Sequence, residues 1–218
     1  MGRSLCIFFS MTLAVAFAGE AALAGGGARP GKCARPWVFF DLGETLVDTK
    51  TSDFKALTFM PGAREYVRHL ARKGYPMGLI VNIPANWGRD RAERVATLVK
   101  FIDEKWADPA AFDWKIFGER ILVPNSDGER KPHPALFQEA QALATAAHCP
   151  AVYEGEDATE IKVAAAERMT AYQVFATKPN VFMPEGLIRK LQLPRSSPSP
   201  IRAPLPEPLA VPPGLLEL

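Results

Sequence analysis

The sequence predicts a single α/β domain with a parallel sheet of about five strands and helices on both faces. Three observations lead to this fold class. Short apolar runs alternate along the chain with helical patterns, turn or polar residues follow each run, and the 218 residues are 48% hydrophobic, enough to bury one core. Parallel sheets bind ligands at the carboxyl ends of their strands, so the residues directly after each run are candidates for a functional site.

Five apolar runs are the expected strands, because each is too short for a buried helix. They cover residues 37–42, 77–81, 120–123, 151–153 and 171–175. Helical periodicity fills the intervals, for example with Val95, Leu98 and Ile102 on one face. The expected helices cover residues 65–73, 91–106, 134–147 and 161–169.

Residues 1–24 have the three parts of a secretory signal peptide. Arg3 precedes an apolar run over residues 5–19, and Ala22 and Ala24 form an Ala-x-Ala cleavage site. The run is shorter than the ~20 apolar residues of a membrane-spanning helix. We therefore expect a secreted or periplasmic protein with no stable membrane anchor, and an uncleaved anchor is the alternative.

The C-terminal segment 179–218 holds 10 of the 20 prolines of the chain. Proline cannot donate to a strand ladder and breaks helix interiors, so we expect a solvated tail with polyproline character, preceded by at most one short helix over residues 187–193. The predicted organisation is a signal peptide (1–24), a linker (25–36), one domain (37–178) and a Pro-rich tail (179–218).

Charge gives no support for a nucleic-acid partner. The chain has 26 Lys and Arg residues and 24 Asp and Glu residues, which leaves a net charge of +2 and no strongly basic face.

Four motifs follow the expected strands in order. They are the DLGETL stretch that begins at Asp41, the strand that ends at Val81 and Asn82, a helix start at Lys131, and the acidic YEGEDATEI stretch over residues 153–161. Their order and spacing over about 140 residues resemble the haloacid dehalogenase (HAD) superfamily. This resemblance implies a Rossmann-like, HAD-type domain with little or no cap, because only residues 48–59 separate the first motif from the next helix.

The resemblance also implies catalytic roles. Asp41 attacks phosphorus and forms an aspartyl-phosphate, which divides one difficult displacement into two steps. Lys131 holds the nucleophile and the phosphoryl oxygens by charge, and Glu160 orients its ammonium group. Thr45 fixes the loop by a local hydrogen bond. The expected reaction is hydrolysis of a phosphorylated substrate that the sequence does not identify.

A Mg²⁺ cofactor is implied as well, because an anionic nucleophile that attacks an anionic phosphate needs a cation to neutralise both. The candidate ligands are Asp41, the Gly43 carbonyl, Glu156, Asp157 and Glu160. The acidic residues favour a metal-dependent phosphatase over the dehalogenase branch of the family, which works without a metal.

Two positions depart from the family pattern. Gly43 stands where the phosphatases have a second aspartate, a general acid and base whose loss typically costs about 10²–10⁴ in rate. Val81 stands where a Ser or Thr hydroxyl usually binds phosphate, so the adjacent Asn82 is expected to donate its amide instead. Glu44 and Asp48 are the candidates to replace the missing acid.

Each motif residue also has a simpler interpretation. Asp41 alone is a turn cap, Lys131 alone is a solvated loop charge, and the acidic residues after Gly155 suit the first turn of a helix. The alternative function is therefore a catalytically degenerate HAD-like binding protein. Such a protein engages a partner through the open site or through the Pro-rich tail.

The strand order of the family implies a disulfide between Cys33 and Cys149. Cys33 lies eight residues before Asp41 and Cys149 seven before Glu156, which places both at the amino ends of neighbouring strands. A disulfide suits a secreted protein, and two unpaired thiols are the alternative. Among the aromatic residues, Trp87, Trp106 and Trp114 are expected to serve core packing or a partner surface.

Overall fold

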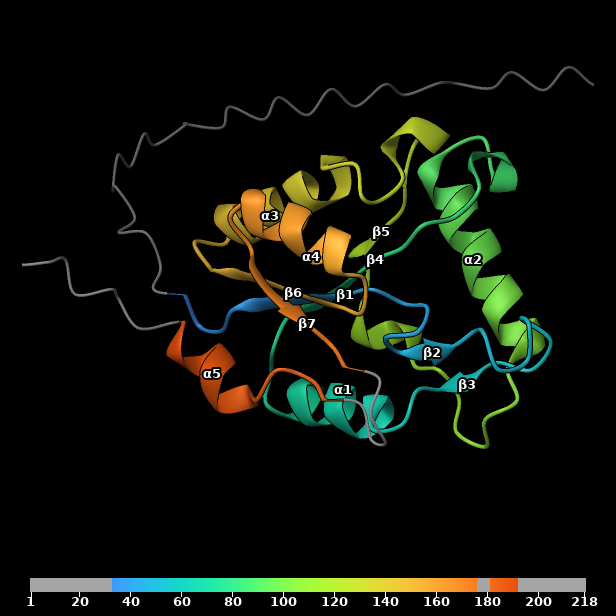
Figure 1. The fold of residues 1–218 in the computed structure, drawn as a ribbon, viewed down its shortest axis with the longest axis horizontal. Helices are drawn as coiled ribbons and strands as arrows, with labels where there is room; N and C mark the ends of the chain where they lie inside the picture. Colours follow the sequence, from blue (N-terminus) through green and yellow to red (C-terminus); the bar gives the residue numbers. More distant parts are fainter. Residues whose placement is uncertain (1–32, 176–180, 192–218) are drawn as a thin grey trace, which may run out of the picture. The chain divides into compact units, whose positions relative to one another are not determined.

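The structure is a computed structural model that describes residues 33–175 and 181–191. Five parallel strands form one sheet in the order β5-β4-β1-β6-β7 (Figure 1). The strands are β1 (Trp37–Phe40), β4 (Met77–Ile80), β5 (Ile121–Leu122), β6 (Ala151–Gly155) and β7 (Thr170–Gln173). β1 lies in the centre, where Phe39 is in register with Gly78 of β4 and Tyr153 of β6. The predicted α/β fold with a five-stranded parallel sheet is confirmed.

Helices cover both faces of the sheet, with α3 and α4 on one side and α1 and α5 on the other (Figure 1). Side chains of β1 alternate between the faces, since Phe39 packs with Phe137 of α3 while Val38 and Phe40 pack in the opposite cluster with Leu70 of α1. The helices are α1 (Ala63–Arg72), α2 (Arg91–Lys105), α3 (Ala135–Ala146), α4 (Ala158–Ala166) and α5 (Glu185–Lys190). Short 3₁₀ turns are η1 (Ala85–Trp87), η2 (Trp114–Ile116) and η3 (Asp127–Glu129).

The segment between β1 and α1 forms a small antiparallel hairpin of β2 (Val47–Asp48) and β3 (Thr58–Phe59). Residues 41–62, all of which the structure describes, contain no helix. The carboxyl ends of the strands are therefore bordered by a short hairpin loop rather than by a helical cap.

A disulfide joins Cys33 and Cys149, whose Cα atoms lie 4.9 Å apart. The two cysteines precede β1 and β6, and these neighbouring strands are parallel with Trp37 in register with Ala151. The disulfide that the family strand order implied is therefore confirmed, at the end of the sheet opposite to Asp41.

Residues 181–191 belong to the folded domain, although the sequence analysis ends the domain at residue 178. Phe182 and Met183 are buried, Ile188 is fully buried, and the Phe182 ring stacks on Tyr66 at a centroid distance of 4.6 Å. The high proline content of this part of the chain suggested an unfolded tail. The few apolar residues of the segment nevertheless pack against α1. The expected signal peptide and residues 192–218 of the expected tail lie outside the described residues. Within the described ranges, no helix combines the length and the apolar character needed to cross a bilayer.

A fully buried carboxyl group, Glu154 of β6, ties this C-terminal segment to the sheet. Glu154 Oε2 accepts the Met183 backbone N–H at 2.9 Å, and the Tyr66 hydroxyl lies 2.7 Å from both Glu154 Oε1 and the Met183 carbonyl oxygen. Burial raises the pKa of Glu154 to about 8. Because a hydroxyl has one proton, a protonated Glu154 can donate to Tyr66 while Tyr66 donates to Met183.

Glu154→Gln is expected to remove a pH dependence of stability. The folded-state pKa lies above the ordinary glutamate value of 4.5, which applies to the unfolded chain. The stabilising contribution of Glu154 is therefore complete below that value and is lost as the pH rises through about 8, by up to ~1.4 kcal/mol per pH unit. Glutamine offers the same donor and acceptor as the protonated acid but does not titrate. Urea unfolding in EDTA between about pH 5 and 8.5 measures the effect.

The quantity to compare is the free energy of unfolding of the variant minus that of the wild type. Glu156 also has a raised pKa, but it titrates in both proteins, so the difference isolates Glu154. This difference should increase with pH in favour of the glutamine variant. A difference that stays constant over the range would show that Glu154 does not hold its proton in the folded state.

Candidate active site

Asp41 is the first residue after the central strand. Its backbone N–H donates to the Glu154 carbonyl oxygen at 2.9 Å, so the pairing with β6 extends past the end of β1. The apolar residues Val38, Phe39 and Phe40 are fully buried and fix the strand. The core therefore delivers the Asp41 carboxylate to the carboxyl edge of the sheet, where a parallel α/β fold binds its ligands.

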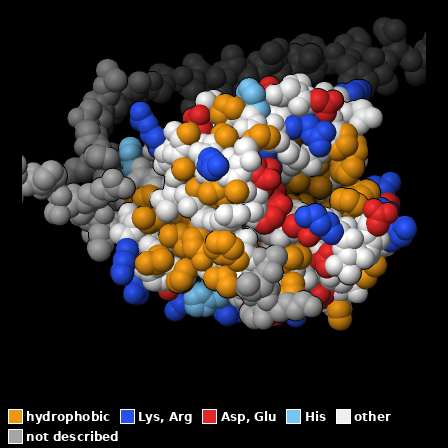
Figure 2. Space-filling model, in the orientation of Figure 1, with side chains coloured by type: hydrophobic (Ala, Val, Ile, Leu, Met, Phe, Trp, Pro, Cys, Tyr) orange, Lys and Arg blue, Asp and Glu red, His pale blue; other side chains and the backbone are white. Residues whose placement is uncertain are grey.

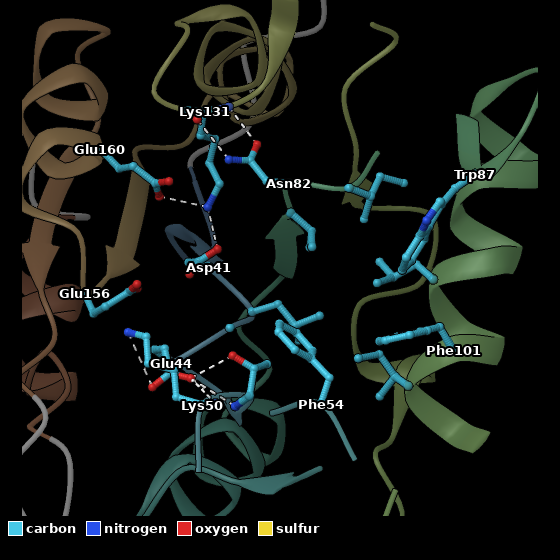
Figure 3. A pocket seen from close by; sticks show the side chains of 17 residues that line it. Asp41, Glu44, Lys50, Phe54, Asn82, Trp87, Phe101, Lys131, Glu156 and Glu160 are labelled. Atoms are coloured by element: carbon cyan, nitrogen blue, oxygen red, sulfur yellow. Dashed lines mark hydrogen bonds and ion pairs between the residues drawn. The ribbon is translucent and has the colours of Figure 1, made fainter. Parts of the chain in front are cut away.

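Lys131 brings three distant parts of the chain together at this edge (Figure 3). Its ammonium group forms ion pairs with Asp41 Oδ1 and, at 2.8 Å, with Glu160 Oε2. The Tyr153 hydroxyl lies 3.3 Å from Lys131 Nζ and donates to Glu160 Oε2 at 2.6 Å. Burial by itself lowers the pKa of Lys131, but the Asp41 and Glu160 carboxylates outweigh it and raise the pKa above its usual value. Lys131 is therefore a fixed positive charge beside Asp41, although its side chain is only 2% exposed.

Asn82 holds the backbone of Lys131. The Asn82 amide nitrogen donates to the Lys131 carbonyl oxygen at 2.9 Å, and the Lys131 N–H donates to Asn82 Oδ1 at 2.7 Å. The sequence analysis expected this amide to contact phosphate. The structure makes Asn82 a positioning residue for Lys131, because both ends of its amide are engaged with that peptide.

Glu156 is the second carboxylate that faces Asp41. It follows β6 directly and accepts a hydrogen bond from the Thr45 hydroxyl at 3.0 Å. The hydroxyl of Thr45 thus bonds across the site to Glu156, and not within its own loop as expected. Burial and the charge of the nearby Asp41 raise the pKa of Glu156 to about 7. Two carboxylates held close together without a cation between them repel each other, and this repulsion is what a divalent ion would remove.

The donor set fits Mg²⁺, a hard cation that binds one or two carboxylates and keeps several waters. Asp41 and Glu156 supply the carboxylates, and Gly43 lines the same pocket with its carbonyl as a third candidate donor. In residues 33–175 and 181–191, no group of three or more Asp, Glu, His or Cys side chains converges on one point. Water would therefore complete the coordination sphere.

The structure separates the three acidic residues that the sequence analysis grouped as metal ligands. Glu156 faces Asp41, but Asp157 caps α4, because its Oδ1 accepts the N–H groups of Thr159 at 2.7 Å and Glu160 at 3.0 Å. Those hydrogen bonds lower the pKa of Asp157. Glu160 is turned to Lys131. The ligand role assigned to Asp157 is thus corrected to a helix cap, and that of Glu160 to a partner of Lys131.

Both candidate substitutes for the missing acid form hydrogen bonds within the hairpin loop. The Glu44 carboxylate accepts the backbone N–H groups of Thr49 and Lys50, each at 3.0 Å, and the Thr49 hydroxyl at 2.7 Å. Asp48 accepts the N–H of Thr51 at 2.9 Å. Both side chains stabilise the hairpin loop, and Glu44 also lines the pocket that contains Asp41.

A pocket of about 290 Å³ opens beside these residues. Its polar end contains Asp41, Lys131 and Glu156, and its opposite wall contains Trp87 and Phe101 (Figure 3). Figure 2 shows acidic side chains in the middle of this face, near the start of α4, with hydrophobic side chains between them and α2. The pocket therefore joins a charged end to an apolar one.

No protein-family model and no curated protein matches the chain. The chain is similar to a HAD family enzyme from Bacteroides thetaiotaomicron, crystallised with magnesium and inorganic phosphate, at 14% identity and a TM-score of 0.42, over 65% of this chain and 95% of that chain. It is also similar to a HAD-superfamily hydrolase from Ehrlichia chaffeensis at 14% identity and a TM-score of 0.41, over 63% and 91% of the two chains. At this level of likeness, the function has to follow from the residues of the chain itself.

Sequence reasoning missed two kinds of site residue. Tyr153 stands inside the fourth motif, and the alternation along β6 already placed it on the face that receives Lys131. Trp87, Trp106 and Trp114 pack against the core, as expected. Trp87 also lines the pocket, which was not expected. No pattern along the sequence distinguishes these three tryptophans, because only the path of the chain after β4 brings Trp87 to the site.

Proposed function

We propose that this protein is a HAD-like, Mg²⁺-dependent phosphate-ester hydrolase that works through an aspartyl-phosphate. The observation that carries the proposal is the group formed by Asp41, Lys131, Glu156 and Glu160 at the carboxyl edge of the parallel sheet. A nearly buried carboxylate beside a fixed ammonium group suits attack on a phosphoryl group, because the charge that binds the phosphate also orients the nucleophile.

In the proposed reaction, an Asp41 carboxylate oxygen attacks phosphorus and the bond from phosphorus to the alcohol oxygen breaks. Lys131 binds phosphoryl oxygens as their charge shifts, and Glu160 and Tyr153 keep its ammonium group in place. Water then attacks the aspartyl-phosphate at phosphorus, which releases phosphate and restores Asp41. Asp41, Glu156 and the Gly43 carbonyl would hold Mg²⁺, which would supply positive charge to offset the repulsion between the nucleophile and the phosphate. With glycine at position 43, water supplies the proton for the departing oxygen.

Phosphate release from 4-nitrophenyl phosphate and a panel of small phosphorylated metabolites tests this proposal, with Mg²⁺ or EDTA. We expect turnover that needs the metal and falls by at least about 10³ in Asp41→Asn, because an amide cannot form the covalent intermediate. The asparagine variant keeps the shape of the side chain and is thus the matched control. Turnover that survives in Asp41→Asn would refute the covalent mechanism.

A second candidate is the degenerate binding protein, and the observation that favours it is Gly43. The binding-protein function predicts that phosphate binds at the Lys131 site and that turnover does not exceed that of the Asp41→Asn control. Calorimetric titration with inorganic phosphate and Mg²⁺ separates this outcome from complete inactivity.

We propose further that the protein works outside the cytoplasm. The Cys33–Cys149 disulfide supports this location, because such bonds persist in oxidising compartments.

A further inference from the structure

The apolar wall of the pocket consists largely of aromatic rings. The ring centroids of Phe54 and Phe101 lie 6.3 Å apart, and those of Trp87 and Phe101 lie 5.1 Å apart. Ile83, Leu98 and Ile102 also line the pocket, and none of these six side chains carries a charge. Such a wall offers face and edge contacts to a flat apolar group but few partners for a sugar or a second phosphate.

Phe54 is held over the pocket in an unfavourable backbone conformation. Its φ is 59°, and that of Asp53 is 50°, so both residues are in the left-handed region that side chains other than glycine rarely adopt. The Phe54 N–H donates to the Thr49 carbonyl oxygen at 3.0 Å, and Glu44 fixes the Thr49 backbone. Phe54 is nevertheless 46% exposed. Strained backbone conformations cluster at functional sites, so a half-exposed aromatic residue in such a conformation, in the same pocket as Asp41, is a candidate ligand contact.

The size of the pocket limits that ligand. A volume of about 290 Å³ is at the lower end of the range for small-molecule sites, roughly 300–1,000 Å³. It suits one phosphoryl group and one ring rather than a dinucleotide or a long chain.

The lack of a general acid at position 43 also favours an aromatic substrate. Without a general acid, the departing oxygen leaves as its anion or takes a proton from water. A phenol is a much stronger acid than an alkanol, so a phenolate leaves more readily than an alkoxide. The missing acid therefore matters least for an aryl ester.

We propose that the substrate is a phosphate monoester of a single-ring phenol, with its phosphoryl group at Lys131 and its ring against Phe54, Trp87 and Phe101. The assignment rests on the proposed function for its reacting end and on the aromatic wall for the ring.

Equilibrium binding of two non-hydrolysable probes tests the ring contact apart from catalysis. Phenylphosphonate and methylphosphonate are titrated into the purified protein with Mg²⁺ and followed by calorimetry. We expect the phenyl compound to bind at least about tenfold more tightly, and Phe54→Ala to reduce that preference about three- to tenfold. Phe54→Tyr, which keeps the ring, should retain it. Phe175→Ala is the matched control, because Phe175 is 55% exposed and does not line the pocket.

The outcomes separate the two proposals. Equal affinities for the two phosphonates, or a preference that Phe54→Ala leaves unchanged, would overturn the aromatic assignment even if phosphate esters are hydrolysed. A phenyl preference that depends on Phe54, together with no turnover of phenyl phosphate, would overturn the hydrolase and retain the aromatic phosphate ligand.

Discussion

Gly43→Asp is expected to raise kcat for phenyl phosphate by about 10², because it supplies the general acid and base that the site lacks. Gly43 lines the pocket beside Asp41. A Cβ built there would lie 3.6 Å from Thr49 Oγ1 and 3.7 Å from Thr49 Cγ2, which are ordinary contacts. The backbone of Gly43 is not among those with positive φ, so a side chain adds no strain.

The size of the gain should depend on the leaving group. A general acid helps a poor leaving group most, so methyl phosphate should gain more than phenyl phosphate, and 4-nitrophenyl phosphate should gain least. Gly43→Asn is the matched control, since it has the same shape but does not transfer protons at neutral pH. An equal gain in the asparagine variant, or one that does not vary with the leaving group, would show that position 43 acts by packing.

Lys131→Met is expected to lower both activity and stability. The Lys131 ammonium group neutralises Asp41 and Glu160 in a buried site. Removing it leaves those carboxylates without a cationic partner, which should lower the free energy of unfolding by about 3–5 kcal/mol at pH 7. Loss of the charge that binds the phosphoryl oxygens should lower kcat/KM by about 10²–10³. Urea unfolding and phosphate release measure the two effects.

A second variant separates the two losses. Lys131→Met combined with Glu160→Gln removes one of the unpaired charges, so it should recover part of the stability and none of the activity. Lys100→Met is the control, because Lys100 is an exposed lysine on α2. Full activity in a folded Lys131→Met protein would show that Lys131 is only structural.

The order of strands and helices could be predicted from the sequence because it depends on local patterns. The apolar run before Asp41 and the periodicity of α2 are complete within a few residues of chain. The end of the domain was predicted too early, because the packing of Phe182 and Ile188 depends on α1 and Glu154, more than 25 residues earlier in the chain.

The sequence by itself also determined which residues to examine at the site. Asp41 lies at the carboxyl end of one predicted strand and Lys131 follows another, and parallel strands place their carboxyl ends at one edge. The direction of each side chain was decided only by the tertiary structure. Asp157 and Glu160 are three residues apart on the same helix start, yet one caps the helix and the other reaches Lys131.

The aromatic wall is the clearest case in which the sequence did not predict which side chains meet. Phe54, Trp87 and Phe101 come from a hairpin loop, a 3₁₀ turn and a helix, and they meet only when β1 and β4 are paired. Local sequence fixes the pattern of each segment, because hydrogen bonding and burial repeat over a few residues. Contacts between segments depend on loop paths and on side-chain rotamers that packing selects. No single segment of the sequence could therefore predict the pocket.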